Sequence, residues 1–512
     1  MKNYKILLMI MLGVITITSC SNLEEEPLLL ISPENVFSSA SDLESGVGAA
    51  YSHAINEEIW GRKLSVALML RSDMVNLQSD QTRRVEMNEH TITTDNEMVY
   101  DPWERIYQGI AAANTVIEAS EFVQGDTALK NLYVAEARFI RAWYYFHLVR
   151  LFGDVPYIGE SVTGVNIQEV ADMTSTPEEE VYANIIEDLQ FAEANLPTTV
   201  VARSRPSVAA AKGYLALVYL TMAGTSDQVN FQLAYNKAKE VIDNAGTYNV
   251  GLDPDFQTLF NADKIDGSIE PLFALDYNNV EADDNAYDQI SPMTGVRSDD
   301  DDQGWSVAVP TMAVYESFDE DDYRTRVSFQ TEASINGTVV DYTNFTISGH
   351  VHAANQPYIA KYSRYPGAYA RGNKRATSHN YSMLRYAEVL LIAAEAGVEV
   401  GATDALSLLN QVRARARNGG QSTNGGYVEE TIPASTVPAD LTSITVADVL
   451  EERRIELAFE CKRWYDIKRR DLGDVVFSAS GYEGFKSGFD KTVDYDTPIQ
   501  QRALAGQPNL TD

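Results

Sequence analysis

Few side chains in this sequence have the spacing that metal binding requires. Among the six histidines only His350 and His352 are close together, and no cysteine lies near them, whereas a zinc site needs three or four such ligands. The acidic run at residues 299–302 offers oxygen ligands of the kind that calcium takes, but Pro310 stands where an EF-hand loop starting at residue 299 would carry Glu. A solvated loop is therefore favoured over a calcium site, and we expect no cofactor.

Motifs for covalent or phosphoryl chemistry are missing as well. The sequence contains no Gly-x-Ser-x-Gly nucleophile elbow, no phosphate-binding glycine loop and no dinucleotide fingerprint. Hydrolysis of a glycosidic bond needs only two carboxyl groups, and 74 Asp and Glu residues supply candidate pairs, but nothing in the sequence selects one. We predict a protein that is not an enzyme, with a surface glycosidase as an alternative that has no positive support.

The composition narrows the range of partners. The 40 Lys and Arg residues against 74 Asp and Glu give a net charge of −34, which repels phosphate backbones and anionic lipid heads. We therefore expect no nucleic-acid partner. The chain has 28 Tyr and 5 Trp, and these side chains combine a flat apolar face with a polar tip that suits wet binding surfaces. Neutral molecules, cations or other proteins are the more plausible partners.

The first residues predict export and lipidation. Lys2 and Lys5 precede an apolar run at residues 6–17, which is too short for a permanent transmembrane helix and is typical of a signal peptide. Small residues then lead into Cys20, a pattern that resembles a bacterial lipobox, in which the cysteine thiol receives a diacylglycerol. We expect residues 1–19 to be removed and Cys20 to carry the lipid. An ordinary signal peptide followed by a chance cysteine is the alternative.

One predicted helix near the C-terminus mixes charges with aromatic residues. Residues 451–466 alternate acidic and basic side chains, which could form either a charged active site or a structural lattice of ion pairs. Alternation of both signs along one helix favours the lattice. Cys461 shares an apolar stripe with Leu450, Leu457 and Trp464, so we expect it to be a core residue.

Helical periodicity starts near residue 38. It predicts the helices that hold the charged and aromatic side chains in place. Apolar residues recur every three or four positions at 42–51, 103–117, 132–151, 177–196, 207–222 and 231–244. Short connections pair these helices, and alanines recur where two of them would cross closely. This pattern favours stacked helix pairs like those of tetratricopeptide repeats, although no strict 34-residue period is visible. Four-helix packing without repeat character stays an alternative.

The texture of the sequence changes between residues 246 and 378. Gly, Asn, Asp, Tyr and Pro are frequent there, and long irregular stretches in compact proteins are often functional. Helices return at 381–398, 402–417 and 446–469. We therefore predict one domain over residues 20–512, with a helix-pair scaffold at about 38–245 and 380–470 and a loop-rich part at 246–378 that carries the binding face.

Several motifs resemble the SusD/RagB family. The C-terminal ones are RYAEVLLIAAEA at 385–396, LNQVRAR at 409–415, ERR at 452–454 and RWYDIKR at 463–469. The N-terminal half adds AEARFIRA at 135–142, FGDVP at 152–156 and RPS at 205–207. These motifs stand in the order expected for the family, and the resemblance covers nearly the whole chain from Cys20 to about residue 470.

The resemblance implies a mainly α protein in which degenerate tetratricopeptide-like helix pairs form an α/α superhelix. It also implies a glycan-binding lipoprotein that captures an oligosaccharide or polysaccharide and passes it to a SusC-like TonB-dependent transporter. Such a protein is anchored in the outer membrane by its lipid and faces outward, and the acidic leader after Cys20 resembles the signal for that transfer. A peptide-binding or structural lid of the RagB kind is the main alternative.

The resemblance also suggests where a ligand would bind. Trp305, just ahead of a short helix, resembles the stacking tryptophan of a starch-binding member, with a buried packing residue as the alternative. Tyr287 is a weaker match to a second stacking aromatic residue, and Arg71, Asp73 and Asn76 fall where that member supplies polar contacts. Its aromatic contacts in that segment are absent here, which argues against starch.

The chemical class of the glycan is less sharply defined by the sequence. The negative charge favours a neutral glucan or similar glycan over a polyanion. Arg71, Arg297 and Arg371 lie in the candidate loops and would reverse that preference if they faced the ligand.

Overall fold

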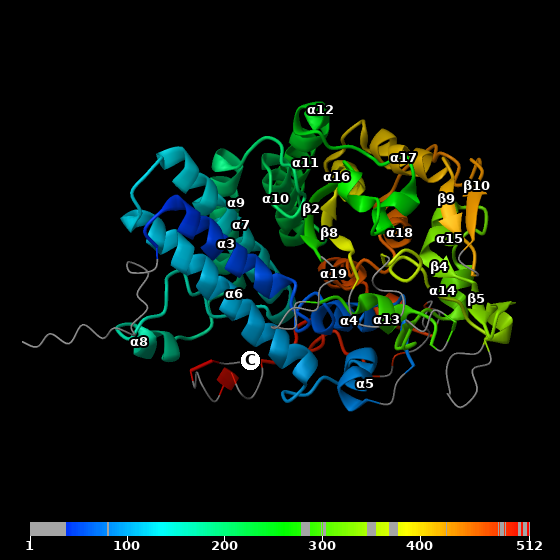
Figure 1. Cartoon of the computed structure of the whole chain (residues 1–512), viewed down its shortest axis with the longest axis horizontal. Coiled ribbons are helices and arrows are strands. Elements are labelled where there is room, and N and C mark those ends of the chain that lie inside the picture. The colour runs from blue at the N-terminus through cyan, green and yellow to red at the C-terminus, as the bar shows by residue number, and fades with distance from the viewer. Residues whose placement is uncertain are drawn as a thin grey trace, which may run out of the picture.

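A computed structural model gives the fold of the chain (Figure 1). It describes residues 37–78, 81–277, 287–297, 299–300, 304–345, 355–367, 377–425, 428–479, 481, 486, 488–499, 503–504 and 509–510. The signal peptide, Cys20, His350, His352, Arg371 and residues 301–302 of the acidic run lie outside the described residues.

Long helices pack side by side in sequence order through the N-terminal half. Each helix of the following series contacts the next one: α3 (Ala40–Ala54), α6 (Glu97–Phe122), α7 (Thr127–Phe152), α9 (Glu178–Asn195), α10 (Val208–Ala223) and α11 (Gln228–Asp243). Figure 1 shows them as a stack that runs from blue to green. The predicted mainly α fold of tetratricopeptide-like helix pairs is confirmed.

Local sequence explains where these helices begin and how closely they pack. Asn96, Asp126, Ser207 and Asp227 each precede a helix and accept a hydrogen bond from a backbone N–H of its first turn, which satisfies a donor that the helix itself leaves free. The alanines noted at the crossings are buried, and their small size allows close approach of the backbones: Ala135, Ala142, Ala209, Ala210, Ala216, Ala234 and Ala238.

The C-terminal helices complete the same stack. Helix α16 (Tyr386–Val400) packs on α11, so the scaffold closes across the loop-rich part, and α17 (Ala405–Ala416) and α18 (Val446–Glu456) pack on α16. Helix α19 (Arg463–Arg469) contacts α4 (Lys63–Leu70). The predicted helix at 381–398 is partly wrong, because its first residues form a strand, β8 (Asn380–Arg385), that pairs with β2 (Pro271–Asp276).

The predicted continuous helix at 446–469 is also wrong, since α18 ends at Glu456 and α19 starts at Arg463. Phe459 and Cys461 have positive φ angles of 64° and 60°. In this turn the Glu456 backbone oxygen accepts from Arg385 Nη2 at 2.8 Å and the Phe459 oxygen accepts from the Tyr362 hydroxyl at 3.0 Å. Tertiary partners therefore replace the hydrogen bonds of a helix. Cys461 is 5% exposed, as expected for a core residue.

The remaining elements are short. The described strands pair in antiparallel twos: β1 (Asn76–Leu77) with β3 (Ala308–Val309), β4 (Phe329–Gln330) with β7 (Tyr358–Ile359), β5 (Glu332–Ile335) with β6 (Thr338–Asp341), and β9 (Gly420–Thr423) with β10 (Glu429–Ile432). The short helices are α5 (Thr82–Glu89), α8 (Ile167–Ala171), α12 (Ala245–Tyr248), α13 (Ile290–Thr294), α14 (Met312–Glu316), α15 (Tyr323–Ser328) and α20 (Gly473–Val476).

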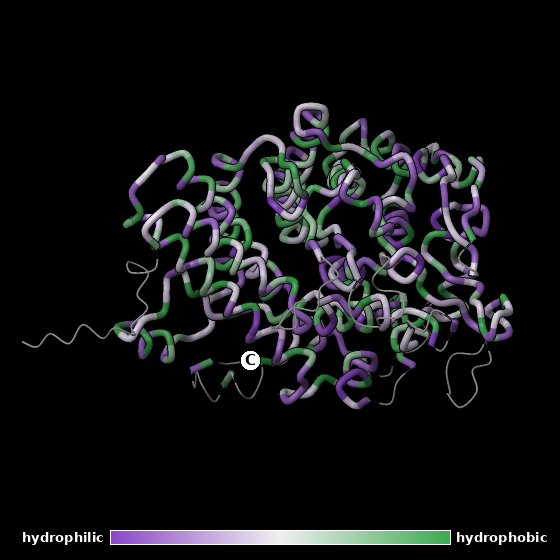
Figure 2. The backbone as a smooth tube through the Cα atoms, in the orientation of Figure 1, coloured by the Kyte–Doolittle hydropathy of each residue, from purple (hydrophilic) through white to green (hydrophobic). Residues whose placement is uncertain are grey.

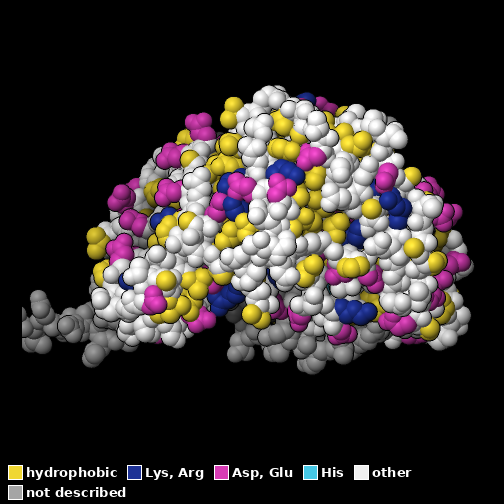
Figure 3. All heavy atoms as spheres, turned by 90° about the horizontal axis from the view of Figure 1, so that it is seen from above, with side chains coloured by type: hydrophobic (Ala, Val, Ile, Leu, Met, Phe, Trp, Pro, Cys, Tyr) yellow, Lys and Arg dark blue, Asp and Glu magenta, His cyan; other side chains and the backbone are white. Residues whose placement is uncertain are grey.

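Hydropathy follows the packing of the long helices. Figure 2 shows hydrophobic and hydrophilic residues alternating along the helices of the N-terminal half, and one contiguous buried cluster runs through the scaffold. Acidic side chains spread over the face seen in Figure 3. Among the described helices, none has the length and apolar character needed to cross a lipid bilayer.

A buried lattice of ion pairs holds α18 in place. The Glu456 side chain is fully buried and accepts from Arg385 Nη1 at 2.6 Å, from Arg324 Nη1 at 3.0 Å and from Arg415. Burial alone would raise the pKa of Glu456, but the three guanidinium groups hold it far below its ordinary value. The charged segment at 451–466 thus forms the structural lattice predicted from the sequence.

Candidate functional site

The structure brings two of the expected ligand residues, Asn76 and Trp305, into one neighbourhood. Strand β1 begins at Asn76 and pairs with β3, with Asn76 opposite Val309, and Gln78 N donates to Val307 O at 2.8 Å. Trp305 N donates to Pro292 O of α13 at 2.5 Å. We call this region the Trp305 face, defined as Trp305, β1, β3, α13 and α5. Figure 1 shows α5 and α13 close to α4, which contacts both.

A tight backbone turn fixes the position of Trp305. A Cβ atom on Gly304 would lie 2.0 Å from Val296 O, so only glycine fits there. Ser306 has a φ of 52° and its hydroxyl accepts from Arg297 N at 2.9 Å. Trp305 itself is half-buried against the main core. The residue therefore keeps part of its surface exposed on a backbone that has little freedom to move.

Asn76 pairs with β3, which follows Trp305 in the chain, and is held by α5. Its Oδ1 atom accepts from Asn88 Nδ2 at 3.0 Å and from Leu77 N at 2.7 Å. Asn76 is partly exposed, and its Nδ2 group has no hydrogen-bond partner among the described residues. A pre-positioned amide donor on an exposed surface can bind a sugar hydroxyl.

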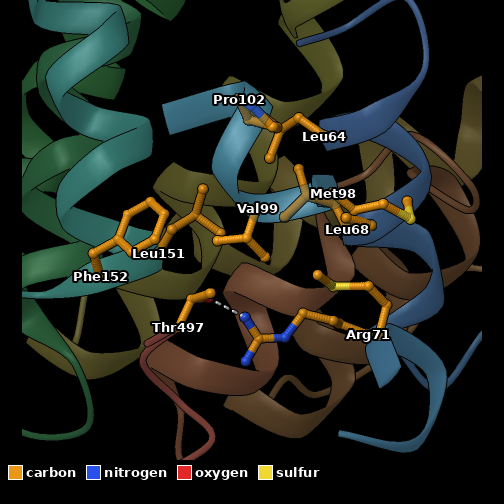
Figure 4. Close-up of a pocket in the computed structure, with 11 residues that line it drawn as sticks. Leu64, Leu68, Arg71, Met98, Val99, Pro102, Leu151, Phe152 and Thr497 are labelled. Atoms are coloured by element: carbon orange, nitrogen blue, oxygen red, sulfur yellow. Dashed lines mark hydrogen bonds between the residues drawn. The ribbon is translucent and has the colours of Figure 1, made fainter. Parts of the chain in front are cut away.

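Arg71 does not reach this face. It is 2% exposed, its guanidinium lies 3.9 Å from the centroid of the Trp464 ring, and Nη1 donates to Thr497 Oγ1 at 2.5 Å. Figure 4 shows it beside a cavity lined mainly by apolar side chains, whose volume of about 20 Å³ leaves room for about one water molecule. The expected glycan contact of Arg71 is corrected to a role in packing.

Asp73 is buried as well. It is 0% exposed and takes both hydrogen bonds of an Arg463 fork, from Nε and Nη2 at 2.8 Å each. Burial alone would raise the pKa of Asp73, but Arg463 and Arg454 hold it below its ordinary value. Its carboxylate has no free side for a ligand, so this expectation is also corrected.

Tyr287 lies near the face but points inward. The residue is 7% exposed, and its backbone oxygen lies 2.4 Å from where a Cβ on Gly61 would be, so the two chains cross closely. Two residues later Gln289 N donates to Gly61 O at 2.7 Å. A ring with so little exposed surface offers no plane for stacking in this conformation, contrary to the expectation.

The acidic run has a structural role where it is described. Asp300 accepts from Asn336 N at 2.7 Å, from Gly337 N at 2.8 Å and from Ser334 Oγ at 2.6 Å. It therefore caps the turn of the β5–β6 hairpin. No group of three or more His, Cys, Asp or Glu side chains in the described ranges converges as a metal site would.

Two further hollows lie away from the Trp305 face. A groove of about 410 Å³ runs along α6 and is lined by Trp103, Tyr107 and Ile158 among others. A polar cleft of about 280 Å³ lies at the edge of the β2–β8 pair and contains Asp266 and Asp276. Neither hollow contains any residue expected from the sequence to bind a ligand.

Sequence reasoning missed two side chains of α5 on the Trp305 face. Asn88 is 3% exposed and holds Asn76, and Arg84 is 6% exposed one turn earlier. The adjacent pair Arg83 and Arg84 in a strongly acidic chain was the available signal, but only the fold shows which of the two is paired.

Comparison with known proteins assigns the chain to a family. A family profile described as "Starch-binding associating with outer membrane" matches residues 23–220, and one described as "SusD family" matches residues 342–511. SusD-like protein P2 of Formosa agariphila is 42% identical over 519 residues, which cover 100% of this chain and 99% of that one. A SusD-like protein of Bacteroides ovatus is 28% identical over 73% of this chain and 66% of its own length.

Solved structures share the fold. A SusD homologue from Bacteroides thetaiotaomicron has a TM-score of 0.77 at 21% identity and covers 94% of this chain and 97% of its own. A laminarin-binding SusD-like protein has a TM-score of 0.73 at 22% identity, with 93% and 99% covered. Surface glycan-binding protein A from Bacteroides uniformis has a TM-score of 0.73 at 22% identity, with 92% and 99% covered. The chain belongs to the SusD family, which is associated with the outer membrane.

Proposed function

We propose that this protein binds a glycan at the Trp305 face and delivers it to a SusC-like TonB-dependent transporter. The observation that carries the proposal is the half-buried Trp305, fixed by the Gly304 turn on the segment whose strand β3 pairs with β1 and Asn76. The apolar face of a sugar ring stacks on such a side chain, and the sugar hydroxyls need polar partners like Asn76. Family relatives named as glycan-binding and laminarin-binding support this role.

Affinity electrophoresis tests the binding step. Mature protein without Cys20 runs through native gels that contain one polysaccharide each, next to Trp305→Ala and Phe122→Ala. Phe122 is a matched aromatic control, because it is 46% exposed at the far end of α6. We expect at least one glycan to retard the wild type and Phe122→Ala, and the loss of Trp305 to weaken binding at least about tenfold, as for a central aromatic anchor.

The outcomes separate the alternatives. Retardation that Trp305→Ala retains would keep glycan binding but move the site elsewhere. If no glycan retards the folded protein, peptide binding or a purely structural role at the transporter becomes the better explanation. Release of sugar products during incubation would instead favour a glycosidase.

We also propose that the lipid on Cys20 anchors the protein to the outer membrane, on its outward side, next to the transporter. The apolar N-terminal run that ends in a lipobox-like sequence at Cys20 and the acidic residues after it support the anchor. The test is fractionation of cells that carry wild type or Cys20→Ala, combined with protease accessibility of intact cells. We expect the wild type to be protease-accessible and to copurify with a TonB-dependent barrel, and Cys20→Ala to leave the membrane fraction.

A further inference from the structure

Helix α5 carries a guanidinium group that has no counter-ion among the described residues. Arg84 is 6% exposed and has no hydrogen bond, ion pair or ring contact among the described residues. Its two basic neighbours differ. Arg83 pairs with Glu97 and donates to Gln81 at 3.0 Å, and Arg62 pairs with Glu57 at 3.2 Å and donates to Gln289 at 3.0 Å.

An unpaired cation in this position is unfavourable for the free protein. Burial removes part of the water that would hydrate the guanidinium, and no carboxylate of the described residues replaces it. Burial and then the charges of Arg83 and Arg62 lower the pKa of Arg84 to about 10, so the group stays charged at neutral pH. An anion that reached it would restore the lost electrostatic stabilisation.

The position of Arg84 relates this charge to the Trp305 face. Asn88 lies one turn further along α5, on the same side of the helix as Arg84, and its Nδ2 donates to Asn76 Oδ1 at 3.0 Å. The Oδ1 atom of Asn88 is buried and has no partner among the described residues. Arg84 thus lies on the same side of α5 as the residue that contacts β1, and β1 pairs with β3, which begins three residues after Trp305.

We propose that the glycan bound at the Trp305 face is acidic, and that Arg84 binds one of its carboxylate or sulfate groups. This inference rests on the proposed function of that face. Neutral hydroxyl groups cannot compensate a nearly buried guanidinium charge, whereas a carboxylate or sulfate does so through charge-assisted, bidentate hydrogen bonds.

The net charge of −34 does not outweigh this contact. Repulsion from exposed carboxylates is largely screened beyond about 8 Å at physiological ionic strength, whereas a contact pair at a nearly buried site is screened much less. The local charge therefore decides the class of ligand, and it reverses the preference for a neutral glucan that the composition alone suggested.

The experiment compares matched polysaccharides and matched variants. Binding of uncharged dextran, dextran sulfate, neutral laminarin and a polyuronate is measured by affinity electrophoresis and calorimetry for wild type, Arg84→Gln, Arg84→Lys and the control Arg83→Gln. We expect a charged glycan to bind and Arg84→Gln to weaken it about 10- to 100-fold, the range for a hydrogen bond to a charged group. Arg84→Lys should retain part of the affinity, and Arg83→Gln nearly all of it. The polyuronate and the sulfated glycan distinguish the two anionic groups.

The melting temperature distinguishes a ligand-binding arginine from a structural one, because replacing a structural arginine would lower it. Arg84→Gln removes an unpaired charge, so its melting temperature should equal or exceed that of the wild type while binding is lost. A lower melting temperature together with unchanged binding would overturn the proposal.

The remaining outcomes separate this inference from the proposed function. Equal binding of a neutral glycan by wild type and Arg84→Gln keeps the proposed function and refutes the acidic ligand. If no polysaccharide binds, the proposed function fails, and a sodium sulfate titration decides about Arg84. If sulfate raises the melting temperature of wild type and of Arg83→Gln more than that of Arg84→Gln, the anion site is retained. If sulfate raises all three melting temperatures equally, the anion site is ruled out.

Discussion

The lattice around Glu456 and the Trp305 face use similar residue types in opposite ways. In the lattice each buried guanidinium has a carboxylate partner, as for Arg324, Arg385 and Arg415 on Glu456. On the Trp305 face Arg84 has none in the described part of the chain, although its side chain is also largely buried. A buried ion pair that is complete fixes the fold, whereas an incomplete one leaves electrostatic stabilisation for a ligand to supply. The contrast indicates that the Trp305 face, unlike the lattice, contains a charge that a ligand could neutralise.

Loss of the central lattice carboxylate should have the largest effect. Glu456→Gln leaves the buried guanidinium groups of Arg324, Arg385 and Arg415 around a neutral amide, and we expect a destabilisation of about 3–5 kcal/mol. Thermal and urea unfolding measure it. The control is Glu451→Gln on the same helix, where a side chain with 44% exposure should contribute less than about 1 kcal/mol. Similar losses for both variants would contradict the lattice as the basis of stability.

A variant of Asp73 tests whether this residue stabilises the fold or binds the ligand. Asp73→Asn breaks the buried fork with Arg463, so we expect a loss of about 2–4 kcal/mol in stability and no change in glycan affinity measured on the folded variant at low temperature. A variant of normal stability that had lost glycan binding would return Asp73 to the ligand site.

Asp288 sharpens the comparison through pH, because it is a buried carboxylate without a cation. Its side chain accepts from Ile290 N at 2.7 Å and from Thr377, and burial raises its pKa to about 6. Since the folded pKa exceeds the unfolded one, the folded state binds the proton more tightly, and stability falls as the pH rises from about 4 through about 6. Asp288→Asn should remove this fall and stabilise the protein by up to about 3 kcal/mol at neutral pH, with no gain below pH about 4.

The lattice carboxylates should show the opposite pH dependence. Burial would raise the pKa of Glu456 and Asp466, but their arginine partners depress both values. Their contribution to stability is therefore present above the ordinary carboxyl pKa and is lost as the pH falls below about 4. Melting curves of wild type and Asp288→Asn between pH 3 and 8 measure both trends, and a single trend shared by all carboxylates would contradict the comparison.

The smallest effect is expected at Asn76. Asn76→Ser shortens the side chain that Asn88 holds, and we expect less than about 1 kcal/mol in stability and a few-fold weaker glycan binding. Calorimetry against the glycan identified for the wild type measures it. Binding that is abolished entirely would make Asn76, rather than Trp305, the centre of the site.

Much of the scaffold was predictable because its signals are local. Caps such as Asp126 and Ser207 and the apolar periodicity of α6 and α7 mark helices from neighbouring residues alone. The predictions that failed depended on contacts distant in sequence. The turn between α18 and α19 forms because Arg385 and Tyr362 bind its backbone oxygens, and residues 380–385 form a strand because β2 lies alongside.

The candidate site was predictable only in part for the same reason. The β1–β3 pairing joins the segments that contain Trp305 and Asn76, and their role in ligand binding stays a prediction. Arg71, Asp73 and Tyr287 come from the same stretches of sequence, yet burial decides their roles, and burial depends on Trp464, Arg463 and Gly61. Sequence position alone could not separate these residues.

The sequence by itself determined the helical scaffold, the predicted export signal, the acidic character and the family, because periodicity, composition and ordered motifs are properties of the chain read in one dimension. Only the tertiary structure decided which charges are paired. A guanidinium is neutralised by whichever carboxylate lies within a few ångströms, and that distance is set by the packing of segments hundreds of residues apart, as for Asp73 and Arg463. Among the described residues, that packing brings no carboxylate to Arg84 on the Trp305 face.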